Sequence, residues 1–285
     1  MRLEFYNAKL AKIVNSAKKN LESQNSELEI PQDFAQFNEL IGLPKHPVTF
    51  KSTPLMPYQI EFAKLIPQSR NIRFHINKSR QIGVTELISR VLAYQSFFKY
   101  KGGKILIIAG TRMDTAGEIM RRFKELFQNI PGTILDAKNS LKLSLKNGTE
   151  IEALPSNSSA IRGLTKIKAI FVDESAHFNL IDDSIVLDAI LPLVDTNQAD
   201  LFLVSTPNGR RGFFYEISIN ENNYHKIQWD YTVAAGFIYQ LEEFEAKFQD
   251  KTVDVDQEYR CQFTSPRTSI FGDDFDTEDF EVEEL

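Results

Sequence analysis

Four short runs of apolar residues, separated by segments of helical periodicity, constrain the fold of this chain more than any other feature. The runs are rich in Ile, Val, Leu and Phe and cover residues 71–76, 104–109, 169–172 and 200–204. The segments between them have the apolar spacing of helices and cover residues 85–100, 114–128 and 181–191. Strands that are apolar throughout and alternate with helices predict a parallel sheet covered by helices on both faces.

One segment departs from this alternation. Leucine occupies every second position from Leu141 to Leu145, and an alternating run resumes after Asn147-Gly148. An Asn-Gly pair between two alternating runs is the strongest short-range signal for a β-hairpin. We therefore predict an antiparallel hairpin over residues 140–154, added to the parallel sheet.

The regions outside this centre have weaker patterns. Residues 4–22 are expected to form a helix, and the proline-rich residues 23–57 a connector that wraps the core. One further strand is expected over residues 225–233 and a helix over residues 239–248. The last 13 residues hold eight acidic and no basic side chains, which is typical of a solvated tail.

Composition is that of an ordinary soluble globular protein, with 42% hydrophobic and 25% charged residues. No apolar run approaches the roughly 20 residues of a membrane helix. The first residues lack the apolar core of a signal peptide. Cys261 is the only cysteine, so an internal disulfide is excluded. These features predict a cytoplasmic protein.

The net charge of −6 argues against a constitutive, sequence-specific DNA-binding protein. Most of this charge comes from the acidic tail, because the remaining residues hold 33 bases and 39 − 8 = 31 acids. The body of the chain is thus nearly neutral. Any contact with nucleic acid is expected to be local and weak.

A first candidate site lies where the strand at residues 71–76 runs into a helix. The standard phosphate-binding loop has the form G-x-x-x-x-G-K-[ST]. Gly83 and Thr85 match its second glycine and its hydroxyl, but Lys78 replaces the first glycine and Val84 the lysine. A long side chain at the first loop position can still bring an ammonium to phosphates that bind the inward-facing N–H groups. On this segment alone, a turn that binds no nucleotide is an equal alternative.

The second candidate is the acidic pair Asp173-Glu174, which follows the apolar run at residues 169–172. This is the Walker B pattern, in which Asp173 holds Mg²⁺ and Glu174 polarises the attacking water. Ligands of open α/β sheets bind at the carboxyl ends of strands, where these charges lie. The pair follows the candidate loop in the same alternating pattern, which favours a nucleotide site over a solvated acidic turn.

Two further motifs are weaker. Ser205-Thr206-Pro207 ends the strand at residues 200–204, and hydroxyls there could sense the γ-phosphate and relay its loss. Tyr58-Gln59 precedes the first strand, where an aromatic ring could stack on adenine and an amide could pair with its polar edge. Taken alone, the first motif is more typical of an ordinary strand end, and Tyr-Gln is common before a helix.

Together these segments resemble, in the same order, the motor domain of the large terminase subunit of tailed viruses. Residues 79–85 resemble the deviant Walker A motif of that family, some of whose members carry the lysine at the start of the loop, as Lys78 does. Residues 155–163, which include Arg162, resemble the segment that precedes its Walker B motif. The likeness spans roughly residues 50 to 270 of the chain.

The resemblance implies an α/β P-loop NTPase of the ASCE type, with a mostly parallel central sheet, an added antiparallel hairpin and an N-terminal helical extension. It implies ATP and Mg²⁺ as cofactors. The residues expected to bind nucleotide are Tyr58, Gln59, Lys78, Ser79, Gln81, Gly83, Val84 and Thr85. Thr85 and Asp173 are expected to bind Mg²⁺, Glu174, Arg162 and Arg80 to act in catalysis, and Ser205, Thr206 and Pro207 to couple hydrolysis to movement. Arg162 is expected to act on a neighbouring subunit and Arg80 within its own.

The implied function is ATP-driven translocation of double-stranded DNA into a viral procapsid. The implied partners are weakly and non-specifically bound DNA, the portal and the small terminase subunit. We expect a monomer in solution and a homo-oligomeric ring on the capsid, in the host cytoplasm. The expected divisions are residues 1–50 (helix and connector), 51–270 (motor domain) and 271–285 (acidic tail), without a nuclease domain.

Two alternatives remain open from the sequence. One is a helicase-like or remodelling ATPase, and the other is a nucleotide-binding assembly switch with little turnover. The segment from Asp173 to His177 approaches the DEAH box of helicases, but Ser175 is inserted. We therefore expect His177 to start a helix or to pack, and not to act in catalysis.

Overall fold

The structure is a computed structural model that describes residues 29–66, 69–109, 113–154, 161, 163–178, 180–249 and 253–264. The expected helix over residues 4–22, Arg162 and the acidic tail lie outside the described residues. The chain divides into two compact units, Met1–Pro31 and Gln32–Leu285, and the second contains all the elements described below.

The second unit is built around one eight-stranded sheet with the order β3-β4-β5-β2-β6-β7-β1-β8. Six neighbouring strands, from β5 to β8 in that order, are parallel, and β4 pairs antiparallel with both β3 and β5. The strands are β1 Arg73–Lys78, β2 Lys104–Ala109, β3 Ile134–Asp136, β4 Lys142–Leu145, β5 Glu150–Leu154, β6 Ile167–Asp173, β7 Asp200–Ser205 and β8 His225–Trp229. The mostly parallel sheet and its antiparallel hairpin are therefore confirmed.

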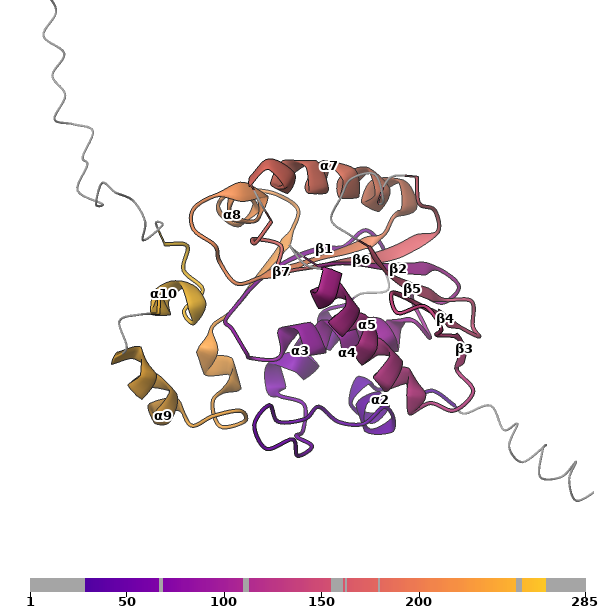
Figure 1. Cartoon of the computed structure of the whole chain (residues 1–285), viewed down its shortest axis with the longest axis horizontal. Coiled ribbons are helices and arrows are strands. Elements are labelled where there is room, and N and C mark those ends of the chain that lie inside the picture. Colours follow the sequence, from indigo (N-terminus) through magenta and orange to yellow (C-terminus); the bar gives the residue numbers. More distant parts are fainter. Residues whose placement is uncertain are drawn as a thin grey trace, which may run out of the picture. The chain divides into compact units, whose positions relative to one another are not determined.

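Helices cover both faces of the sheet (Figure 1). On one face α7 and α8 bury Val186, Ile190 and Phe214 against β6 and β7, and on the other α4 and α5 pack side by side. The α-helices are α2 Phe34–Leu40, α3 Pro57–Leu65, α4 Val84–Gln95, α5 Met113–Gln128, α7 Leu180–Asn197, α8 Gly212–Ile219, α9 Leu241–Glu245 and α10 Val255–Glu258. The 3₁₀-helices are η1 Tyr231–Ala234 and η2 Ala246–Gln249. This double cover explains why every position of β7 is buried.

Several boundaries differ from the sequence prediction, each for a local reason. Helix α4 ends at Gln95, because the next turn directs Lys99 and Tyr100 to the buried carboxylate of Asp200, at 2.5 and 2.6 Å. Strand β8 ends at Trp229, because the side chain of Asp230 accepts the backbone N–H of Thr232 and starts η1. The expected helix over residues 239–248 is divided into α9 and η2.

The connector before α3 contains a helix that the sequence did not predict, α2, which packs against α4. Buried Arg90 of α4 joins the two, since its guanidinium donates to the side chain of Asn38 at 2.9 Å and to the carbonyl of Gly42 at 2.8 Å. Glu86 completes the cluster at 2.6 Å from Arg90. Among the described residues, no helix combines the length and apolar character needed to cross a membrane.

Candidate nucleotide site

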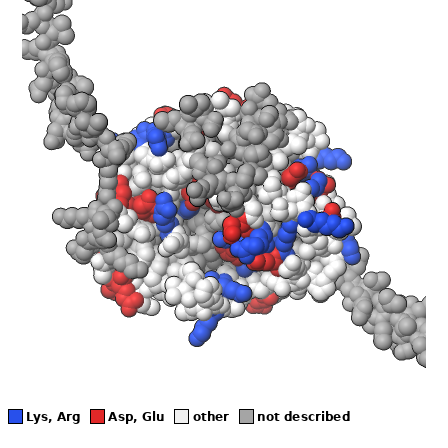
Figure 2. Space-filling model, viewed as in Figure 1, with Lys and Arg blue, Asp and Glu red and all other residues white. Residues whose placement is uncertain are grey.

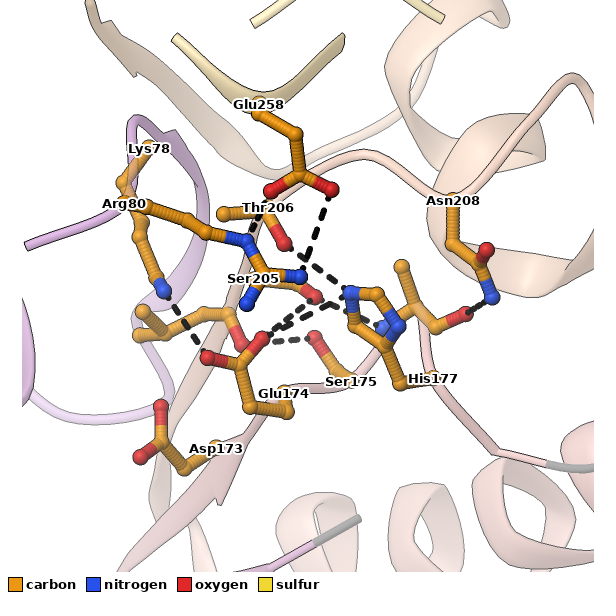
Figure 3. A network of polar contacts seen from close by, with 12 residues as sticks. Lys78, Arg80, Asp173, Glu174, Ser175, His177, Ser205, Thr206, Asn208 and Glu258 are labelled. Carbon is orange, nitrogen blue, oxygen red and sulfur yellow. Dashed lines mark hydrogen bonds and ion pairs between the residues drawn. The ribbon is translucent and has the colours of Figure 1, made fainter. Parts of the chain in front are cut away.

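The strand order brings the sequence motifs to one edge of the sheet. Strands β6, β7 and β1 are neighbours and parallel, so their carboxyl ends at Asp173, Ser205 and Lys78 lie together (Figure 3). Strand β7 separates the strand of the phosphate loop from that of the Walker B motif. This additional strand, together with a glutamate at the end of β6, is the arrangement that the ASCE prediction requires.

The loop between β1 and α4 is held from behind by backbone hydrogen bonds. Ser79 N donates to the carbonyl of Trp229 at 2.8 Å, and Arg80 N donates to that of Glu258 at 3.0 Å. Gln81 and Gly83 both have positive φ, at 61° and 88°, which turns the chain sharply into the first turn of α4. Glycine suits this entry because a side chain is strained there. Val84 is buried, so the usual lysine position holds an apolar side chain.

Lys78, the first residue of the loop, enters the site from the end of β1. Its side chain is buried and its Nζ lies 2.9 Å from Oε1 of Glu174 (Figure 3). Burial raises the pKa of Glu174, but the charge of Lys78 and its hydrogen bond outweigh burial and leave the pKa below its usual value. The early lysine and the Walker B glutamate therefore form an ion pair.

Thr85 and Asp173 form the second contact between the loop and β6. Thr85 Oγ1 donates to Asp173, with distances of 3.1 Å to Oδ2 and 3.4 Å to Oδ1. Burial and the neighbouring charge of Glu174 raise the pKa of Asp173 to about 6, while Lys78 and Thr85 oppose this shift. A hydroxyl and a crowded carboxylate are oxygen donors that fit a hard divalent cation.

The turn after β6 is tied to the end of β7. Glu174 has a φ of 52°, an uncommon conformation for a residue with a side chain, and such residues cluster at functional sites. Ser205 Oγ donates to Glu174 Oε2 at 3.3 Å and accepts the N–H of Ala176 at 3.1 Å. Thr206 Oγ1 lies 2.9 Å from Nε2 of His177. Ser205, Thr206 and Pro207 are all buried, so this strand end is firmly packed.

His177 was expected to start a helix or to pack, and not to act in catalysis. The residue lies in the turn before α7, and its side chain is hydrogen-bonded within the site. The partial DEAH spelling was the signal that could have identified it, but Ser175 shifts the spacing.

Tyr58 and Gln59 lie behind the loop and contact it. Tyr58 OH donates to the carbonyl of Ile82 at 2.5 Å, and its ring packs 4.9 Å from that of Trp229. Gln59 accepts the N–H of Met56 at 3.0 Å and lies 3.4 Å from Tyr58 OH. Both side chains are buried, and the Tyr58 hydroxyl is the one hydrogen-bonded to the loop. Their role in adenine binding stays a prediction.

Arg80 points out of the loop towards the C-terminal segment, residues 253–264. Its guanidinium forms an ion pair with Glu258 of α10 (Figure 3). Two further bonds join this segment to the site: Asn77 donates to the carbonyl of Cys261 at 2.8 Å, and Gly209 N donates to Gln257 at 2.8 Å. The sequence did not predict Glu258, since no local pattern marks a partner 178 positions from Arg80.

The fold and the site together define a P-loop NTPase of the ASCE class. Its sheet carries the inserted strand, its loop turns into a helix at a left-handed glycine, and its acidic pair follows β6. The particular family is given by comparison with known proteins.

The family described as terminase large subunit, T4likevirus-type, N-terminal, matches residues 75–274, which is 200 of the 285 residues. The chain belongs to this family, as the sequence predicted. This membership disfavours the helicase-like alternative. No curated protein matches the chain.

Solved structures show the same fold. The large terminase ATPase domain of Thermus phage P74-26 is 20% identical with a TM-score of 0.58, over 83% of this chain and 100% of that one. The large terminase of a thermophilic bacteriophage, in complex with ADP, is 12% identical with a TM-score of 0.56, over 74% of this chain and 54% of that one. The HK97 bacteriophage large terminase is 16% identical with a TM-score of 0.57, over 76% and 50%. The chain spans about half of the last two.

Proposed function

We propose that this domain hydrolyses ATP in the presence of Mg²⁺ and uses the cycle to move double-stranded DNA into a viral procapsid. The proposal rests on the contact of the phosphate loop and the start of α4 with the end of β6, at one edge of the sheet. Lys78 Nζ lies 2.9 Å from Glu174, and Thr85 Oγ1 lies 3.1 Å from Asp173. An ammonium, a hydroxyl–carboxylate pair and a second carboxylate are the groups that phosphoryl transfer to water requires.

Each group has a proposed role. Thr85 and Asp173 hold Mg²⁺, which would neutralise charge on the phosphates. The N–H groups of the loop, from Ser79 to Gly83, and the N-terminus of α4 bind the phosphates. Lys78 exchanges the carboxylate of Glu174 for a phosphate oxygen, and Glu174 is then available to orient the attacking water. Tyr58 and Gln59 support the loop close to the adenine.

The direct test is steady-state hydrolysis by the whole chain. The parent should release phosphate from ATP only when Mg²⁺ is present, and excess EDTA should stop release. Retained binding of an ATP analogue by a parent that releases no phosphate, even when assembled on procapsids, would favour the assembly switch. Release that is equal with and without Mg²⁺ would contradict the proposed roles of Thr85 and Asp173.

We propose that two arginines stabilise the transition-state charge, Arg80 within its own subunit and Arg162 on the ATP of a ring neighbour. Arginine suits this role because its planar fork stays charged and can bridge two phosphate oxygens. Arg162→Ala is expected to bind nucleotide normally and to hydrolyse it slowly.

Mixing separates the two routes for Arg162. Adding Glu174→Gln, which keeps Arg162 but is expected not to hydrolyse, should restore part of the turnover at the intact sites of Arg162→Ala. Arg121→Ala, a change at an exposed helical arginine, is the matched control and should behave like the parent. Co-assembly of the two variants without any recovery would show that Arg162 acts only locally.

The proposed partners follow from the family and from the charge distribution. On the described part of the face in Figure 2, Lys and Arg gather with Asp and Glu in a few clusters separated by uncharged surface. DNA contact is therefore proposed to be weak, non-specific and strongly dependent on salt. Further copies of this chain would form a homo-oligomeric ring on the procapsid, in the host cytoplasm. The portal and the small terminase subunit would be its partners there.

A further inference from the structure

His177 belongs to the polar network around Glu174, but the mechanism above gives it no role. Its Nε2 lies 2.9 Å from Thr206 Oγ1 and 3.7 Å from Glu174 Oε2 (Figure 3). Its backbone N–H donates to the carbonyl of Glu174 at 2.9 Å, which fixes the turn between the two residues. One ring nitrogen therefore faces both the catalytic carboxylate and the first hydroxyl after β7.

The two oxygens of Glu174 have different partners. Oε1 accepts from Lys78, whereas Oε2 accepts from Ser205 and faces His177. When Lys78 turns to the phosphates of bound ATP, Oε1 loses its donor. The contacts at Oε2 then remain as the restraint on the carboxylate, at the moment when its direction matters most. Loss of a restraint of this kind lowers the rate by misplacing the base and need not change nucleotide binding.

The loop that follows Thr206 continues this connection. Asn208 donates to the carbonyl of Ala176 at 3.0 Å, and Gly209 N donates to Gln257 in the C-terminal segment at 2.8 Å. A shift of the segment from Glu174 to His177 would therefore displace groups that are hydrogen-bonded to it, as far as residues 253–264. Coupling of the nucleotide site to this segment requires a structural element with two arrangements, whose balance both regions change.

We propose that His177 is a positioning residue that holds the Glu174 carboxylate for water activation and links it to the hydroxyl of Thr206. This inference rests on the proposed hydrolysis of ATP. The imidazole touches neither substrate nor metal in this scheme and acts through Glu174. The neutral ring is the relevant form, since burial lowers the pKa of His177 in spite of the nearby charge of Glu174. Placed on Nε2, its single N–H would face Thr206 Oγ1 at 2.9 Å and Glu174 Oε2 at 3.7 Å.

The kinetic test uses His177→Ala, with His177→Gln as the conservative variant. His177→Ala should lower kcat by about tenfold to a hundredfold, with KM for ATP and the melting temperature close to those of the parent. Because an amide can reach the same partners, His177→Gln should recover part of kcat. In the Glu174→Gln background, His177→Ala should lower the residual rate no further. A kcat equal to that of the parent, or equal losses with and without Glu174, would overturn the proposal.

A second measurement does not depend on turnover. The ¹⁵N signals of the His177 ring should shift in Glu174→Gln and in Thr206→Val, and should shift less in Thr206→Ser, which keeps the hydroxyl. Signals that respond to neither Glu174→Gln nor Thr206→Val would overturn the proposal even if the parent hydrolyses ATP. A parent without hydrolysis but with these shifts would instead contradict only the proposed function.

Discussion

The phosphate loop contributes the cations of two ion pairs, Lys78 and Arg80. The two pairs differ in the exposure of the cation and in the part of the chain that supplies the anion. Lys78 pairs with Glu174 across the sheet edge, and the Lys78 side chain is only 8% exposed. Arg80 pairs with Glu258 of the C-terminal segment, and the Arg80 side chain is 52% exposed. The first pair joins the end of β1 to the turn after β6, whereas the second joins the loop to the short helix α10.

This difference separates a fixed element from an adjustable one. A buried cation that loses its partner is strongly destabilised, so Lys78 can leave Glu174 only when another anion replaces the carboxylate. A phosphate of ATP is such an anion, and the exchange frees Glu174 at the same time. Arg80 can leave Glu258 for solvent at little cost, since exposed pairs contribute about 0–1 kcal/mol. Of the two cations of the loop, Lys78 thus always requires an anionic partner, whereas Arg80 can move into solvent.

The largest expected effect comes from removing the buried cation. Lys78→Ala should abolish detectable ATP hydrolysis and weaken nucleotide binding, because the phosphates lose their ammonium and Glu174 loses the charge that keeps it ionised. Phosphate release and analogue binding measure the two effects. Lys64→Ala, at the last turn of α3, is the matched control and should behave like the parent. Turnover of Lys78→Ala at the parental rate would show that another group binds the phosphates.

Removing Glu174, the anionic partner of Lys78, should have the next largest effect. Glu174→Gln keeps the size of the side chain but cannot polarise water, and general-base catalysis contributes about 10²–10⁴ in rate. Nucleotide binding should persist or increase, since the amide competes less well than a carboxylate for Lys78. Rapid-quench measurement of single-turnover hydrolysis tests the rate. A variant that hydrolyses ATP as fast as the parent would assign water activation to another residue.

The same substitution should change the titration of Asp173. Burial and the charge of Glu174 raise the pKa of Asp173 to about 6, so its carboxylate takes up a proton as the pH falls through that value. Removing the negative charge of Glu174 favours the ionised form, so Glu174→Gln should lower the pKa of Asp173. Carbon NMR of the nucleotide-free chain measures it. Glu258→Gln removes the carboxylate of the other pair and should leave this titration unchanged.

The sequence predicted the buried pair more completely than the exposed one. Lys78 and Glu174 each end an apolar strand, and local spacing encodes both a strand and its end. The position of β7 between the two strands follows from tertiary packing and was not predicted. The pattern of parallel strands did imply that both strands end at the same edge of the sheet. Glu258 lies in a short helix with no apolar periodicity, and its position beside Arg80 depends on the whole C-terminal path. The contact between His177 and Thr206 was not predicted, because a hydrogen bond between two loops leaves no spacing pattern in the sequence.

Glu258→Gln should give the smallest effect, and it tests directly whether Arg80 can leave Glu258 for the phosphates. If Arg80 is adjustable, Glu258 competes with the phosphates for its guanidinium. Removing that carboxylate should then strengthen binding of an ATP analogue by at most about fivefold, which corresponds to about 1 kcal/mol. The fold should persist, because Arg80 N still donates to the carbonyl of residue 258 at 3.0 Å.

Asp256→Asn provides the matched control for that variant. Asp256 lies on the same helix and also pairs with an arginine, Arg260, at 2.8 Å. Calorimetric titration should therefore give the parental affinity for Asp256→Asn and a higher one for Glu258→Gln. Weaker binding by Glu258→Gln would mean that Glu258 holds the loop in its binding conformation. The exposed pair would then stabilise the site in the same way as the buried pair, and the contrast between a fixed and an adjustable cation would be lost.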